Sequence, residues 1–215
     1  MLSPAEAAAV EARIAQVEAH TGVEVVTTIA GRCDAYPELP WIAFAFGASF
    51  TAFAAALIDL RHPQWPTGHY GLSLVLAILG IGVLFAMLAY SSPLFARVFL
   101  RPHRAETEAR QFAQTHFLER EIFATPQRTG LLMLIGLYER RVVILPDTGL
   151  RKAVSAQDWD GVIVRMTPAL RAGNPAEALR EGLDATEELL LRKGFDAPVS
   201  QANVFPDRPS EVAGP

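Results

Sequence analysis

The sequence predicts a small α/β domain of α/β/α layers, with a two-helix transmembrane hairpin inserted into it. Three observations indicate this arrangement. The 215-residue chain contains two long uncharged runs, helical and strand patterns alternate outside them, and 51% of its residues are hydrophobic against 20% charged. The mean hydropathy of +0.22 is high for a soluble protein, because the apolar excess is concentrated in the two runs.

The two uncharged runs have the length of membrane-spanning helices. We place the first helix at residues 41–60, the second at 70–91 and a short loop at 61–69. About 20 residues are needed to cross about 30 Å of hydrocarbon. Each run should be helical, because lipid offers no hydrogen-bond partners and the backbone groups must pair within the segment. Two buried helices in a soluble core are the alternative, which so short a chain makes hard to accommodate.

The residues that flank the two runs predict the orientation. Aromatic residues stand at the ends of the runs, as in interfacial belts: Trp41, Trp65, Tyr70 and Tyr90. The loop carries one arginine, whereas four follow the second run: Arg97, Arg101, Arg104 and Arg110. The positive-inside rule therefore places both termini and the α/β domain in the cytoplasm, with the hairpin in the inner (plasma) membrane.

Two further features of the membrane region leave alternatives open. Small residues of the runs either let the helices approach closely or are ordinary small residues in lipid: Gly47, Ala55, Gly80 and Gly82. Residues 92–104 mix arginines with aromatic residues. They form either an interfacial segment anchored to lipid phosphates or a plain helix end with flanking charges.

The first part of the α/β domain, residues 1–40, reads as a helix, a strand and a linker. Ser3 and Glu6 form a capping box with Pro4 at the first helical position, and Gly22 ends the helix. The β-branched run at 23–30 then predicts a strand. So few residues cannot bury a core alone. They must therefore meet the second part, residues 92–195, on the same side of the membrane.

The second part alternates helices with a hairpin of strands. A helix is expected from Ala105 to His116, strands at 131–137 and 141–145, a turn at 146–149, and two further helices that end at Gly173 and Gly194. Trp159 belongs to the buried stripe of the first of those two helices. Residues 196–215 are rich in Pro, Ser and Gly and are predicted to be a disordered tail.

Charge, cysteine count and motifs exclude several classes of function. The net charge of −4 gives no basic field for nucleic acid, and a single cysteine, Cys33, excludes a disulfide within the chain. No Walker A loop, His-Glu-x-x-His, cysteine pair or Gly-x-Ser-x-Gly occurs. Candidate chemistry is therefore confined to the strand ends.

Asp147, in the turn after a predicted strand, is the candidate catalytic residue. Its carboxylate would act as nucleophile or general acid in phosphate ester hydrolysis, or as a metal ligand with Asp34; a turn-capping role is the alternative. Arg140 and Arg141 would clamp a phosphate and Arg128 would help to bind it. Glu139 is a further candidate binding residue, and a solvated hairpin tip is the alternative for Glu139 and Arg140.

Several stretches resemble the TPM domain, which is named from a thylakoid acid phosphatase, a photosystem II repair protein and a receptor-modulating protein. They are Glu18–Val26, with its Thr-Gly turn, Arg128–Leu145, Pro146–Leu150, Trp159 and Gly182–Leu183. The resemblance covers roughly residues 3–35 and 105–195 and extends to bacterial members with an inserted membrane hairpin. It implies weak acid phosphatase activity, or assembly and modulation of membrane complexes, and a divalent cation such as calcium or magnesium.

We therefore expect a membrane-anchored protein that acts as a non-catalytic adaptor or modulator of membrane protein complexes. A weak, divalent-cation-dependent acid phosphatase at the membrane surface is the alternative. The adaptor is favoured because phosphoryl transfer needs a concentration of charge that these strand ends do not supply. The expected partners are the lipid bilayer and other integral membrane proteins, and no nucleic acid.

Overall fold

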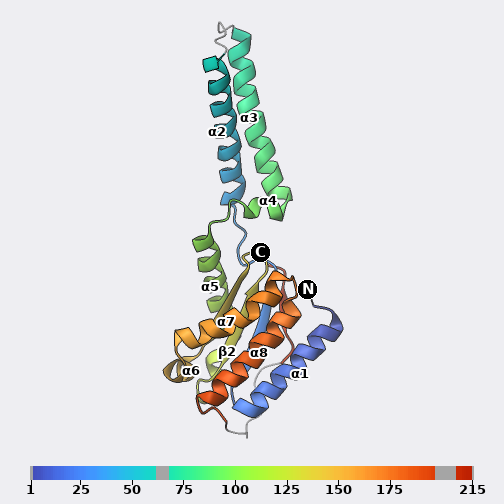
Figure 1. Ribbon diagram of the computed structural model, residues 1–215, viewed down its shortest axis with the longest axis vertical. Helices are drawn as coiled ribbons and strands as arrows, with labels where there is room; N and C mark the ends of the chain where they lie inside the picture. The colour runs from blue at the N-terminus through green and yellow to red at the C-terminus, as the bar shows by residue number, and fades with distance from the viewer. Residues whose placement is uncertain (1, 62–67, 197–206, 215) are drawn as a thin grey trace. The chain divides into compact units, whose positions relative to one another are not determined.

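The computed structural model describes residues 2–61, 68–196 and 207–214, and the chain divides into two compact units (Figure 1). The first unit comprises Met1–Asp34 and Ala105–Pro215, and the second comprises Ala35–Arg104. The first contains a four-stranded sheet and the second contains two long apolar helices.

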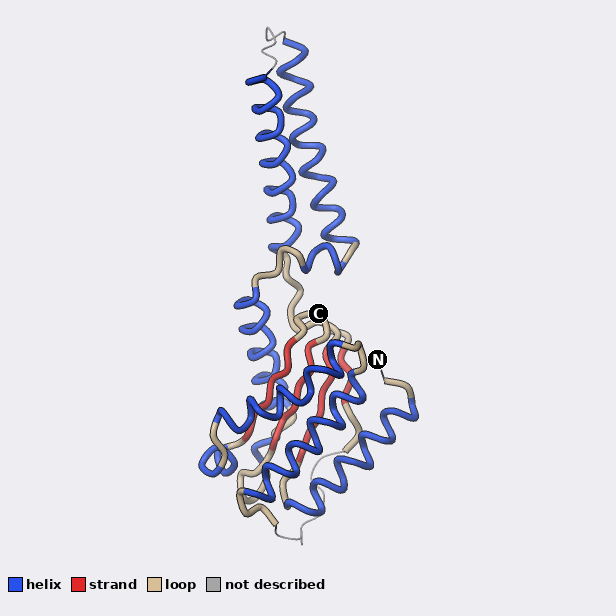
Figure 2. Tube along the Cα trace, in the orientation of Figure 1, coloured by secondary structure: helices blue, strands red, loops and turns tan. Residues whose placement is uncertain are grey.

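The sheet of the first unit joins the two parts of the chain that flank the insertion. Its strands, red in Figure 2, are β1 (Val25–Ala30), β2 (Leu131–Gly136), β3 (Arg141–Pro146) and β4 (Ser210–Val212). They lie in the order β3-β2-β1-β4. β1 pairs in parallel with β2, from Val25 opposite Leu131 to Ala30 opposite Gly136. β2 and β3 form the expected antiparallel hairpin. The prediction that the two parts meet in one domain is therefore confirmed.

Helices cover both faces of this sheet. On one face lie α1 (Pro4–Thr21), α7 (Ala156–Arg171) and α8 (Pro175–Arg192); on the other lies α5 (Pro102–Glu119), followed by the short 3₁₀ helix η1 (Ile122–Ala124). Side chains of β1 and β2 alternate between the two cores, and every residue of both strands is buried. Burial on both faces is characteristic of parallel strands, and the predicted α/β/α layering is confirmed.

Local signals in the sequence place the helix ends. Ser3 and Glu6 form the expected capping box of α1, and Gly22 ends that helix in the left-handed conformation with a φ of 70°. Ser155 and Asp158 form a second box at the start of α7. Trp159 is 5% exposed within the core, as predicted.

The structure corrects the prediction of a disordered tail at residues 196–215. Ser210–Val212 form β4, which pairs in parallel with β1. The backbone N–H of Gly31 donates to the carbonyl of Val212 at 2.8 Å, and the side-chain hydroxyls of Thr28 and Ser210 lie 2.8 Å apart. An uncovered edge of β1 would leave its backbone groups unpaired, and β4 pairs with the half of that edge from Thr28 to Ala30. The predicted disorder at 197–206 lies outside the described residues.

The second unit contains α2 (Glu38–Arg61) and α3 (Gly68–Ser91), which start earlier than the predicted spans. By length and composition both are candidate membrane spans. Part of the predicted loop, 62–67, lies outside the described residues. A short helix, α4 (Pro93–Arg97), follows α3, capped by Ser92.

Two glycines allow α2 and α3 to approach closely, each opposite a phenylalanine of the other helix. A Cβ at Gly47 would lie 2.9 Å from the ring of Phe85, and one at Gly82 would lie 2.8 Å from the ring of Phe44. Gly80 faces open space. The close-approach alternative therefore holds for Gly47 and Gly82 and not for Gly80.

Candidate functional site

Asp147 lies directly after β3 and is the N-cap of a short helix, α6 (Thr148–Ala153), where the sequence predicted only a turn. Its Oδ1 accepts a hydrogen bond from the backbone N–H of Thr148 at 2.6 Å. Its Oδ2 lies 2.9 Å from Nε of Arg128, and its side chain is 2% exposed. The capping alternative for Asp147 is therefore confirmed, and its catalytic role stays a prediction.

Arg128 reaches Asp147 from the segment that precedes β2. Its φ is 57°, in the left-handed region. The backbone is held there because its N–H donates to the Thr125 carbonyl and its own carbonyl accepts from Gly149 N–H at 2.9 Å. The guanidinium carbon lies 5.4 Å from the centre of the Phe123 ring. Arg128 thus lies beside Asp147 with its guanidinium paired to that carboxylate, and its phosphate-binding role stays a prediction.

Glu139 lies at the opposite end of the sheet, in the turn between β2 and β3. It is 6% exposed, and its Oε1 accepts a hydrogen bond from the backbone N–H of Cys33 at 2.9 Å. The expectation of a solvated hairpin tip is therefore wrong for Glu139 and holds for Arg140, which is exposed. Arg141 is half-buried at the start of β3.

The antiparallel register separates the candidate residues into two groups. Arg141 is opposite Gly136 at one end of β3, and Pro146, next to Asp147, is opposite Leu131 at the other. Six residues at about 3.3 Å each place the two ends roughly 17–20 Å apart. Arg140 and Arg141 therefore do not form a phosphate clamp with Asp147.

The predicted metal pair of Asp34 and Asp147 is contradicted by the same topology. Asp34 follows the carboxyl end of β1, which pairs with the Gly136 end of β2, whereas Asp147 lies beside the Leu131 end. Among the described residues, no group of three or more His, Cys, Asp or Glu side chains is arranged to hold a metal ion. In the part of the chain that the structure describes, the two predicted ligands are therefore not brought together, and the divalent cation that the family resemblance implied stays a prediction.

Cys33, treated only as a count in the sequence, belongs with Glu139. It is 7% exposed and follows β1 by three residues. Burial, and then the nearby carboxyl of Glu139, raises the pKa of the Cys33 thiol well above its usual range. The thiol is therefore protonated and inert at neutral pH. In the sequence, the feature that could have singled out Cys33 was its position three residues past the end of a strand.

Glu18 is a second titratable group that the sequence did not single out. It lies on α1, is 9% exposed, and its Oε1 accepts a hydrogen bond from Val25 N–H at 2.7 Å. Burial raises the pKa of Glu18 to about 8; the Val25 hydrogen bond opposes this rise, and the carboxyls of Glu24 and Asp207 add to it. A helix-to-strand contact thus depends on a carboxyl that is mostly protonated at neutral pH.

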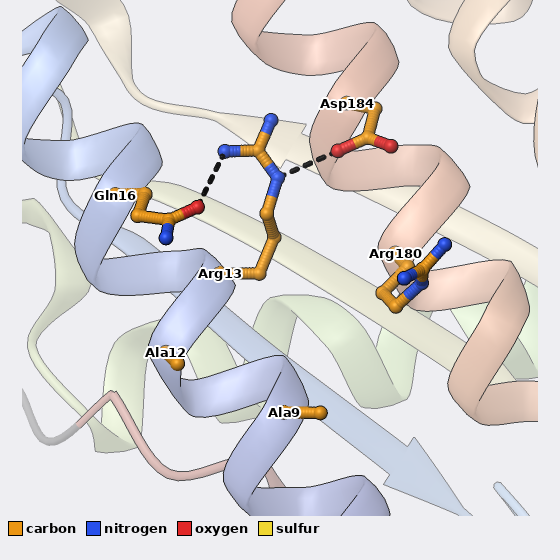
Figure 3. Close-up of a pocket in the computed structure, with 6 residues that line it drawn as sticks. All are labelled: Ala9, Ala12, Arg13, Gln16, Arg180 and Asp184. Atoms are coloured by element: carbon orange, nitrogen blue, oxygen red, sulfur yellow. Dashed lines mark hydrogen bonds and ion pairs between the residues drawn. The ribbon is translucent and has the colours of Figure 1, made fainter.

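A shallow pocket of about 280 Å³ lies between α1 and α8 (Figure 3). Nε of Arg13 donates to Asp184 Oδ1 at 2.6 Å, and its terminal nitrogen pairs with Glu187. Nε of Arg180 lies 3.1 Å from Glu177 Oε2. The pairs of Arg13 with Asp184 and Glu187 join α1 to α8, whereas Arg180 and Glu177 both lie on α8. Both guanidiniums that line this pocket therefore already have carboxylate partners.

Comparison with known proteins identifies the domain. The TPM domain model matches residues 95–189, which include β2, β3 and most of α8. No curated protein matches the sequence significantly. The fold is similar to that of the BA42 protein from the psychrophilic bacterium Bizionia argentinensis, determined by NMR. The two share 13% identity, 98% of this chain and 95% of that chain are covered, and the TM-score is 0.57, which shows the fold alone. The TPM domain model thus matches the second part of the chain, in agreement with the resemblance predicted from the sequence.

Proposed function

We propose that this protein is a membrane-anchored TPM-domain protein that acts as a non-catalytic adaptor or modulator of membrane protein complexes. In this proposal α2 and α3 cross the inner (plasma) membrane as a hairpin, and both termini and the TPM domain are cytoplasmic. The observation that carries the membrane anchor is the row of large apolar side chains that α2 and α3 expose.

These side chains are exposed over the full length of both helices. Phe50 is 61% exposed and Phe53 64% on α2, and Leu76 is 60% exposed and Met87 64% on α3. Transfer of such a side chain out of water is worth about 1.5–3 kcal/mol. Soluble proteins rarely expose apolar patches beyond a few hundred Å². Immersion in lipid gives this surface the apolar surroundings it lacks in water.

The local structure of Asp147 supports a non-catalytic role. A nucleophile or general acid must reach its substrate, whereas this carboxylate is 2% exposed, caps α6 and is paired with Arg128. Phosphoryl transfer also needs several positive groups around one phosphate. Arg140 and Arg141 belong to the other end of the sheet. The buried aspartate is therefore best explained as a structural residue.

The insertion of the hairpin between β1 and β2 supports an adaptor. Two chain segments connect the domain to the hairpin, because β1 precedes the hairpin in the sequence and its partner β2 follows it. A domain tethered twice is confined to the neighbourhood of the membrane. It is therefore better suited to neighbouring membrane proteins than to diffusing substrates.

Hydrolysis of p-nitrophenyl phosphate tests the adaptor against the phosphatase. The detergent-solubilised protein is assayed with and without magnesium or calcium, beside Asp147→Asn and the matched surface variant Asp160→Asn. We expect the same background rate in all samples. A rate that requires Asp147 would establish the phosphatase alternative instead.

Capture from native membranes tests the adaptor itself. The tagged full chain is compared with a tagged chain of residues 35–104, which contains the second unit alone. We expect at least one integral membrane protein to be enriched in near-stoichiometric amount by the full chain only. Equal recovery of every protein by both baits would contradict an adaptor role for the TPM domain.

A further inference from the structure

One end of the α2–α3 hairpin carries four large side chains that are almost fully exposed. Trp41, in the first turn of α2, is 74% exposed, and Tyr90, in the last turn of α3, is 87% exposed. Leu94 on α4 and Val98 directly after it are 72% and 77% exposed. We call these four residues the collar. Its mixture of amphipathic aromatic rings and aliphatic side chains differs from the purely apolar middle of the helices.

A cluster of phenylalanines holds the collar in a fixed position on the hairpin. The ring centres of Phe95 and Phe85 lie 5.7 Å apart, and those of Phe95 and Phe99 lie 5.4 Å apart, with edge-to-face geometry. Phe99 in turn packs at 5.7 Å against Phe46 of α2. Each such pair adds about 0.5–1.5 kcal/mol beyond the burial of its surface. The α4 turn is therefore anchored by its inner face while Leu94 and Val98 point away from it.

The stretch that follows α3 carries arginines and no acidic side chain up to Ala105. No Asp or Glu occurs anywhere in residues 60–105, whereas Arg97, Arg101 and Arg104 follow α3 closely. Arg101 is exposed. Arg104 donates to Glu38 at 3.2 Å, which ties the segment back to the start of α2. Exposed apolar side chains beside a run of arginines match a surface whose outer layer is anionic and whose inner layer is hydrocarbon.

We propose that the collar lies in the headgroup layer of the bilayer and that Arg97, Arg101 and Arg104 bind the phosphates of anionic lipids. The inference rests on the proposed insertion of α2 and α3. Tryptophan and tyrosine at span ends favour this layer because one side of the ring is apolar and the other forms hydrogen bonds. Leu94 and Val98 enter the acyl boundary, and the arginines remain at the level of the phosphates. The collar thus sets the depth of the hairpin and selects the lipids around it.

The depth of the collar is tested with the full chain in phosphatidylcholine vesicles with and without phosphatidylglycerol. A fluorescent label is placed on Leu94→Cys, Val98→Cys, Phe50→Cys and Val164→Cys in turn. The unsubstituted chain, whose one cysteine is buried, gives the labelling blank. Lipids that carry a spin-label quencher in the headgroup or in the mid acyl chain then report depth. We expect the labels at 94 and 98 to be quenched mainly from the headgroup, the label at 50 from the acyl chain, and the label at 164 from neither.

Lipid selection is tested by the anionic lipid retained on the purified protein. A triple variant that combines R97Q, R101Q and R104Q is compared with the single variant Arg165→Gln on α7. Each arginine near an anionic surface contributes about fivefold in lipid association. We expect the triple variant to lose phosphatidylglycerol enrichment by at least tenfold and Arg165→Gln to retain it.

These outcomes distinguish the failure of the collar proposal from the failure of the proposed membrane insertion of α2 and α3. Acyl-chain quenching at 50 without headgroup quenching at 94 and 98 would leave the hairpin inserted and overturn the collar. No quenching at 50 would overturn the proposed membrane anchor, and the collar with it. Unchanged phosphatidylglycerol enrichment in the triple variant would overturn the assignment of the arginines to lipid phosphates.

Discussion

Glu18 makes the stability of the first unit depend on pH, and Glu18→Gln should remove that dependence. The Glu18 carboxyl is buried, and its Oε1 accepts from Val25 N–H, the first N–H of β1. Burial raises its pKa from 4.5 to about 8. A glutamine keeps an acceptor for the Val25 N–H and carries no charge at any pH. The substitution therefore isolates the effect of ionisation from the loss of the contact.

The sign and size of the effect follow from proton linkage. Between pH 4.5 and about 8 the folded state holds the Glu18 proton and the unfolded state has released it. The free energy of unfolding therefore falls as the pH rises through this window, and the full contribution is present only below pH 4.5. At about 1.4 kcal/mol per pH unit the loss is at most roughly 5 kcal/mol.

Thermal melting of the full chain in detergent, followed by tryptophan fluorescence from pH 4.5 to 8.5, measures this loss. We expect Glu18→Gln and the wild type to melt alike at the acid end. The variant should be more stable by up to roughly 10–15 °C at pH 8, since 1 kcal/mol corresponds to about 2–4 °C in a chain of this size. Glu11→Gln, an exposed change on the same helix, controls for the lost charge. A melting difference that does not grow with pH would refute the reasoning.

Three other perturbations test the local packing. Gly149→Ala should destabilise the domain by about 1–3 kcal/mol in chemical denaturation, because its Cβ would lie 2.6 Å from the Gln127 carbonyl oxygen; Gly161→Ala, with open space around it, should be neutral or stabilising. Asp147→Asn should cost about 1–3 kcal/mol through the lost ion pair with Arg128. Cys33 should resist Ellman's reagent until the chain unfolds, and rapid reaction of the folded protein would contradict its burial.

The elements that the sequence predicted are those with strong local signals. Capping boxes at Ser3 and Ser155 fixed the starts of α1 and α7, and β-branched runs marked β1 and β3. The meeting of the two parts followed from a different argument, that neither part could bury a core alone; their pairing through β1 and β2 was not predicted. β4 was missed because a three-residue edge strand has no periodicity to detect and exists only because β1 offers it an edge.

The candidate site was predicted less well because its residues depend on tertiary register. Asp147 and Arg128 meet across a turn in which Arg128 has a positive φ, which no local pattern marks. Glu139 is buried because the chain after β1 passes over the β2–β3 turn and presents the Cys33 N–H to it. The distance between Asp34 and Asp147 follows from the direction of β3. Because β3 is antiparallel to β2, its carboxyl end lies beside the start of β2, at the opposite end of the sheet from the residues that follow β1.

The most direct test of the membrane anchor is the accessibility of the connecting end of α2 and α3 in intact cells. His69→Cys, at the start of α3, and Val164→Cys, on α7, are exposed in the structure and are compared with a membrane-impermeant thiol reagent. We predict that the reagent labels position 69 from outside the cell and labels position 164 only after the membrane is opened. Labelling of 164 but not of 69 in intact cells would reverse the orientation, and labelling of both or of neither would contradict a hairpin that crosses the membrane.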